Sequence, residues 1–80
     1  MIEDIINRYP DEEFLKADGL DDAIIGVDTD NMVLVYSSDQ CVDCFIEQGM
    51  SREEAIEFFE FNTKGAHMGE KTPIFISTEF

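Results

Sequence analysis

The sequence predicts a small α+β domain, and two observations carry this prediction. Two runs rich in β-forming residues, 23–29 and 32–37, flank the turn-forming pair Asp30-Asn31, a pattern typical of a tight β-hairpin. Before and after this hairpin, apolar residues recur at the three- and four-residue spacing of amphipathic helices. Because the chain has only 80 residues, we expect a single domain, residues 1–80.

The first helix is predicted before Pro10 by apolar residues that share one helix face, namely Ile2, Ile5, Ile6 and Tyr9. Pro10 should end this helix because the residue before a proline disfavours helical geometry. The acidic run 11–13 suits the first turn of a helix, so we expect a second short helical turn here, with Gly19 ending it.

The hairpin, residues 23–37, is expected to have a register set by its two-residue loop. This register pairs Val27 with Leu34, and it pairs Ile25 with Tyr36, on one face of the sheet. The opposite face carries Ile24, Val33 and Val35, with Gly26 across from Val35. Both faces are therefore apolar, and we expect the N-terminal helix or another subunit to cover the second face.

Two more helices are predicted after the hairpin. Ser37 or Ser38 can cap a helix over residues 39–48, which Gly49 closes. Its inward stripe should hold Val42, Phe45 and Ile46, with Cys41 beside them. Ser51 and Glu54 have the spacing of a capping box, which opens the next helix.

The helix after Ser51 is predicted to be apolar over an unusually wide surface. One side carries Ala55, Ile56 and Phe59, and a neighbouring stripe carries Phe58 and Phe61. We interpret the excess apolar surface as an indication of a partner or a dimer.

The last strand is predicted over residues 72–77, and Pro73 favours a position at its start or at a sheet edge. The expected order is α, β, β, α, α, β, with a small antiparallel sheet made of the hairpin and this strand.

The charge of the chain restricts its partners. Nineteen Asp and Glu against five Lys and Arg give a formal net charge of −14. Such a field repels nucleic acid and anionic membrane surfaces and favours a basic partner, although acidity can equally serve only to keep a small protein soluble. The start of the chain lacks the features of a signal peptide, and no apolar stretch is long enough to span a bilayer. We therefore expect a cytoplasmic protein.

Few residues suggest chemistry. Cys41 and Cys44 form a Cys-x-x-Cys and are weak metal candidates, since they supply half of a zinc site. Their acidic neighbours should raise the pKa of both thiols, so buried structural cysteines are the default expectation. His67 lies in a glycine-flanked loop without a nearby nucleophile and is a poor catalytic candidate. We predict no catalytic residue and no cofactor.

Two stretches resemble a known family. Residues 18–26 (DGLDDAIIG) and the residues Glu54-Ala55-x-x-Phe58-x-x-x-Asn62 leading into Gly65-Ala66-x-x-Gly69-Glu70-x-Thr72-Pro73-Ile74-Phe75 resemble small uncharacterised proteins encoded by tailed bacteriophages. The resemblance covers about residues 18–76 and implies a phage product that acts in the cytoplasm of a bacterial host. It implies no particular activity.

The leading functional hypothesis is a non-enzymatic protein-interaction module that forms homo-oligomers and engages a basic host protein. Its expected interaction surface consists of Phe58, Phe61, Ile24, Val33, Val35, Glu53, Glu57 and Glu60. One alternative is a nucleic-acid mimic whose carboxylates, those of Glu47, Glu53, Glu54, Glu57 and Glu60, imitate phosphates. Another is a small metal-dependent hydrolase that uses Asp21, Asp22 and Asp28. A virion component is a further structural possibility.

Overall fold

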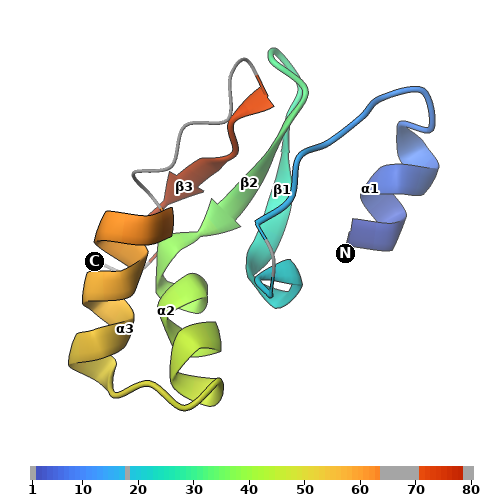
Figure 1. Cartoon of the computed structure of the whole chain (residues 1–80). Helices are drawn as coiled ribbons and strands as arrows, with labels where there is room; N and C mark the ends of the chain where they lie inside the picture. Colours follow the sequence, from blue (N-terminus) through green and yellow to red (C-terminus); the bar gives the residue numbers. More distant parts are fainter. Residues whose placement is uncertain (1, 18, 64–70, 79–80) are drawn as a thin grey trace.

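The computed structural model describes residues 2–17, 19–63 and 71–78 (Figure 1). Within these residues the chain forms a small α+β fold with three α-helices and a three-stranded mixed sheet. The helices are α1 (Ile2–Arg8), α2 (Ser38–Glu47) and α3 (Arg52–Phe58), and the strands are β1 (Ile24–Asp28), β2 (Val33–Ser37) and β3 (Ile74–Ile76). A 3₁₀ turn, η1 (Asp21–Ala23), precedes β1, and a π-helical turn, η2 (Phe59–Thr63), extends α3.

Helix α1 ends before Pro10, as predicted, but the expected helical turn after residues 11–13 is wrong. Residues 12–17 have no regular structure. Tertiary contacts hold this segment instead, because the backbone N–H of Ala17 donates to the hydroxyl of the buried Tyr36 at 2.9 Å. The rings of Tyr9 and Phe14 also meet edge to face, with centroids 6.5 Å apart. A helix would have used this N–H internally and left the Tyr36 hydroxyl without it.

The hairpin register is confirmed near the turn and wrong at its base. Val27 pairs with Leu34 as predicted. Tyr36 pairs with Ile24 rather than with Ile25, because the register shifts between Ile24 and Gly26. An extra residue in one strand, a β-bulge, changes which side chains face the core. Here Ile24 joins Leu34 and Tyr36 in the buried cluster instead of lying on the opposite face.

Strand β3 pairs with β2 in parallel, so the expected all-antiparallel sheet is wrong. The strand order is β1-β2-β3, and Val35 lies next to Ile74. A parallel pair needs a long crossover connection. Helices α2 and α3 lie between β2 and β3 in the chain and provide that crossover (Figure 1).

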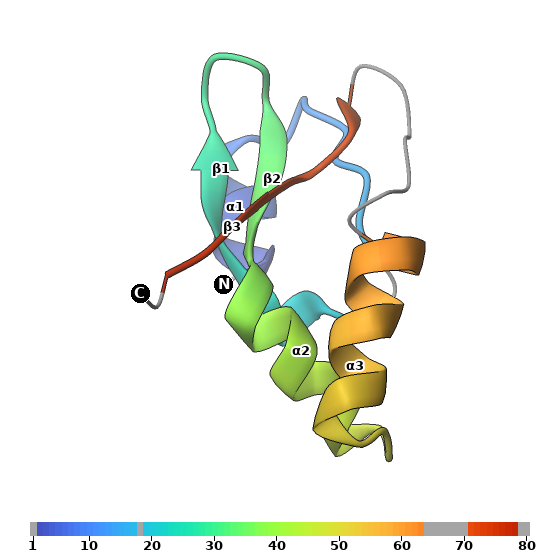
Figure 2. The same ribbon diagram turned by 90° about the vertical axis from the view of Figure 1, so that its left-hand side faces the viewer.

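One cluster of buried residues connects the helices to the sheet. It consists of Ile5, Ala17, Leu20, Ala23, Ile24, Leu34, Tyr36, Cys41, Phe45, Ala55 and Phe59. Phe75 of β3 packs against this cluster and contacts two of its rings, with centroids 5.3 Å from Tyr36 and 5.4 Å from Phe59. Figure 2 shows α2 and α3 next to each other below the hairpin, and Figure 1 shows α1 on the other side of the hairpin from these two helices.

The second face of the sheet, which we expected a helix or another subunit to cover, is partly open among the described residues. Val35 on this face is half-buried, and a Cβ on its neighbour Gly26 would meet open space. At the β3 end Ile76 is 42% exposed. The core therefore fills one face of the sheet more completely than the other.

Candidate functional site

Helix α3 begins at the capping box that the sequence predicts. The hydroxyl of Ser51 accepts a hydrogen bond from the N–H of Glu54 at 3.2 Å. The Glu54 carboxylate in turn accepts one from the N–H of Ser51 at 3.4 Å. This reciprocal pair sets where the helix starts, and so it sets which side chains turn inward.

The phenylalanines at the end of α3 divide between core and surface. Ala55 and Phe59, four residues apart, face inward, and Phe59 is only 3% exposed. Phe58 is 40% exposed and Phe61 is 80% exposed. The edge of the Phe58 ring meets Phe45 of α2, with centroids 4.9 Å apart, which holds Phe58 in place while leaving much of it accessible.

Phe58 and Phe61 border a shallow hollow of about 310 Å³ whose other lining residues are Met50, Glu54, Glu57 and Asn62. We name this region the α3 aromatic surface. Both of its acidic residues are exposed. Two large aromatic rings and a methionine thus lie among carboxylates, an arrangement that can bind an apolar group carrying positive charge.

The other residues expected at an interaction surface divide into two groups. Glu53 and Glu60 are exposed on α3 and η2, and Val35 is half-buried on the sheet. Ile24 and Val33 are each only 3% exposed, so their assignment to a docking surface of the folded chain is wrong. The bulge turns Ile24 into the core, an effect that strict alternation along the strand does not predict.

Cys41 and Cys44 are both free thiols on α2. Burial raises the pKa of the Cys41 thiol to about 12 from its ordinary 9.0. Burial, with Asp22, Glu47 and Asp43 nearby, also raises the pKa of Cys44. Both shifts disfavour the thiolate form that metal binding and nucleophilic chemistry require. In the described part of the chain, no group of three or more metal-ligating side chains comes together.

Of the three acids considered for a hydrolase, Asp21 and Asp28 have separate structural partners. Asp21 forms an ion pair with Lys16 at 3.2 Å. Asp28 closes the hairpin turn by accepting hydrogen bonds from the side chain of Asn31 and the N–H of Asp30, which lower its pKa. These are turn and surface interactions, and they do not aim the carboxylates at a common point. His67 lies outside the described residues.

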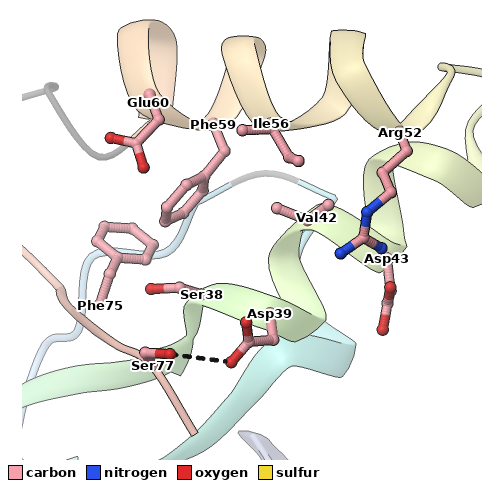
Figure 3. Close-up of a pocket in the computed structure, with 10 residues that line it drawn as sticks. All are labelled: Ser38, Asp39, Val42, Asp43, Arg52, Ile56, Phe59, Glu60, Phe75 and Ser77. Carbon is pink, nitrogen blue, oxygen red and sulfur yellow. Dashed lines mark hydrogen bonds between the residues drawn. The ribbon is translucent and has the colours of Figure 1, made fainter. Parts of the chain in front are cut away.

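A larger pocket, which the sequence analysis missed, lies between α2, α3 and β3 (Figure 3). Its volume is about 350 Å³, and we name it the α2–α3–β3 pocket. It is lined by Ser38, Asp39, Val42, Asp43, Arg52, Ile56, Phe59, Glu60, Phe75 and Ser77. Arg52 and Ile56 of α3 and Glu60 of η2 follow one another at four-residue spacing, which is visible in the sequence. These three side chains line a pocket only because strand β3 packs beside the helices.

Comparisons with known proteins identify no relative: no family model, no curated protein and no solved structure matches this chain. A search for membrane-spanning helices finds none among the residues that the structure describes.

Proposed function

We propose that this protein is a non-enzymatic protein-interaction module that binds a basic partner through the α3 aromatic surface. The observation that carries this proposal is the exposure of Phe58 and Phe61 beside the carboxylates of Glu54 and Glu57. Aromatic side chains supply much of the binding energy at protein interfaces, because they bury large areas and lose little conformational freedom.

Charge indicates the kind of partner. Glu54 and Glu57 line the hollow, and the whole chain carries a formal net charge of −14. Opposite charge accelerates encounter and suppresses wrong partners, whereas the aromatic contacts contribute more to the lifetime of the complex. The proposed partner therefore presents apolar side chains flanked by Lys or Arg. The resemblance of residues 18–76 to tailed-phage proteins favours a host protein in this role.

A homo-oligomer remains a prediction. The open part of the second sheet face, around Gly26 and Val35, is apolar and could accept a second copy. The α3 aromatic surface is a poor site for self-association, since two copies would bring like charges together.

The decisive experiment measures partner capture from a bacterial lysate by the wild-type chain and by a Phe58→Ser/Phe61→Ser double variant. We expect the double variant to lose at least about 90% of any partner that the wild type retains, because centrally placed aromatic residues contribute 2 kcal/mol or more (~30-fold) at interfaces. Capture should also weaken as salt rises, since the carboxylates contribute through long-range attraction.

Leu15→Ser provides the matched control, because Leu15 is 40% exposed, like Phe58, and lies outside the α3 aromatic surface. This control should capture as much partner as the wild type. Equal capture by the double variant and the wild type would overturn the proposal. A captured partner that is a nucleic-acid-binding protein, and that DNA or RNA displaces, would favour the mimic over the general interaction module.

A further inference from the structure

The α2–α3–β3 pocket is a second hollow, separate from the α3 aromatic surface. The two share α3 but no lining residue. Its volume of about 350 Å³ lies within the ordinary range of sites for small molecules and single side chains, which begins at roughly 300 Å³. Its walls come from the consecutive helices α2 and α3 and from β3, which follows later in the chain, so the pocket forms only when β3 packs beside the helices.

The pocket combines an apolar interior with charged groups at its edge. Val42, Ile56, Phe59 and Phe75 supply the apolar walls. The rings of Phe59 and Phe75 meet at 80°, with centroids 5.4 Å apart. This aromatic pair lies at one end of the pocket in Figure 3. An aromatic pair of this kind can pack against the apolar stem of a bound group.

The charged groups favour a cation over an anion. Three carboxylates line the pocket, those of Asp39, Asp43 and Glu60, against the single guanidinium of Arg52. Asp39 is held in position because its carboxylate accepts hydrogen bonds from the N–H of Thr78 at 3.0 Å and from the hydroxyl of Ser77 at 3.4 Å. Carboxylates therefore outnumber cationic side chains among the residues that line the pocket.

Arg52 of α3 and Asp43 of α2 both line this pocket. Figure 3 shows both side chains at the same end of the pocket, opposite the aromatic pair. Asp43 is exposed on α2, so an incoming group can reach it from solvent. An external guanidinium can pair with this carboxylate and lay its apolar stem along Val42 and Ile56.

We propose that the α2–α3–β3 pocket binds a guanidinium group carried on an apolar stem. Two sources share this chemistry: a free alkylguanidine and an arginine side chain of a bound peptide. In both cases Asp43 pairs with the guanidinium group. The Phe59–Phe75 pair and the aliphatic side chains of Val42 and Ile56 contact the stem. Arg52 opposes binding because it carries the same charge as the ligand.

The test follows backbone amide shifts of the full chain by NMR during titration with butylguanidinium. A second titration uses a short arginine-containing peptide, and a third uses the same peptide with citrulline, which keeps the shape of arginine but lacks its charge. Shifts that saturate around Val42, Asp43 and Ile56 with butylguanidinium, but not with the citrulline peptide, are expected. Saturation with the arginine peptide as well identifies a partner side chain as a ligand, whereas binding of butylguanidinium alone identifies a small-molecule site.

Charge variants sharpen the result. Asp43→Asn should weaken binding of butylguanidinium by about threefold or more, the size of an exposed ion pair. Arg52→Ala should strengthen binding, because it removes a competing cation. Glu13→Gln is the matched control, since it makes the same change in net charge at an exposed position outside the pocket, and it should leave binding unchanged.

Two results would overturn this proposal: no saturable shift in the pocket with either guanidinium probe, or weaker binding of butylguanidinium in Arg52→Ala. Shifts confined to Phe58 and Phe61 would also overturn it while leaving the α3 aromatic surface as a binding site. The capture experiment with the Phe58→Ser/Phe61→Ser variant is independent of these titrations, so the two proposals can fail separately.

Discussion

Three phenylalanines near the end of α3 have different environments although they lie within four consecutive positions of the chain. Phe59 is buried against Phe75 and is 3% exposed, whereas Phe61 is 80% exposed. Phe58 is intermediate, because one edge of its ring touches Phe45 while 40% of the residue stays accessible. Residue type therefore does not distinguish core from binding surface here. Position around the helix axis does.

This contrast suggests that the buried and the exposed phenylalanines have different roles. A buried ring stabilises the fold through the contacts that surround it. An exposed ring contributes little to folding, and exposing several large apolar groups together makes association with other molecules more favourable. The comparison predicts that substitutions at Phe59 and at Phe61 will separate stability from binding.

The largest effect is expected for Phe59→Ala. This change leaves a cavity between Ala55 and Phe75, and comparable truncations of buried phenylalanine cost about 3–5 kcal/mol. Urea denaturation followed by circular dichroism measures the loss. Since small domains have only about 5–15 kcal/mol of total stability, the variant should be largely destabilised. A loss below about 1 kcal/mol would contradict the assignment of Phe59 to the core.

An intermediate effect is expected from the pH dependence of stability, through Cys41. The folded-state pKa of Cys41 is raised to about 12 from 9.0, so the neutral thiol is favoured by folding. The stability from this burial is fully present below pH 9 and is lost as pH rises toward 12, because the unfolded state ionises first. At pH 10 the loss should be on the order of 1 kcal/mol.

Cys41→Ala isolates this effect, since lysine and tyrosine titrate equally in both proteins and cancel in the difference. The free energy of unfolding of the wild type should fall faster than that of the variant between pH 8 and pH 10. In the native wild type, a thiol reagent should modify the partly exposed Cys44 before the buried Cys41. Parallel stability curves, or equal rates for both thiols, would show that Cys41 is not buried as described.

The smallest effect on stability is expected for Phe61→Ala, which should change the free energy of unfolding by less than about 0.5 kcal/mol, as is usual for exposed positions. The same denaturation assay measures it beside Phe59→Ala. A cost above 1 kcal/mol would mean that Phe61 belongs to the folding core, and the α3 aromatic surface would then lose its most exposed ring.

Much of the local structure follows from the sequence. Pro10 ends the first helix, Ser37 caps α2, and the Ser51–Glu54 capping box opens α3 as predicted. Val27 and Leu34 pair as the turn residues require. All of these depend on residues within about ten positions of one another, whose geometry is limited by backbone sterics and by short-range hydrogen bonds.

The candidate surface follows from the sequence only in part. The spacing of Phe58 and Phe61 indicates a helix that is apolar over too wide a surface, and both residues are exposed. The sequence does not reveal that Ile24 and Val33 are buried and so cannot belong to a docking surface. Their burial depends on a bulge and on packing between distant segments. The strict alternation of side chains between the two faces of a strand does not predict a register shift of this kind.

The sequence by itself therefore determined the helices, the hairpin, the excess acidity and the surplus of apolar residues near the end of α3. Only the tertiary structure decided that β3 lies parallel to β2, that residues 12–17 extend toward Tyr36 instead of forming a helix, and that α2, α3 and β3 enclose a pocket. The reason is physical: capping and turn formation are local, whereas strand direction and pockets depend on contacts between segments that the chain brings together only on folding.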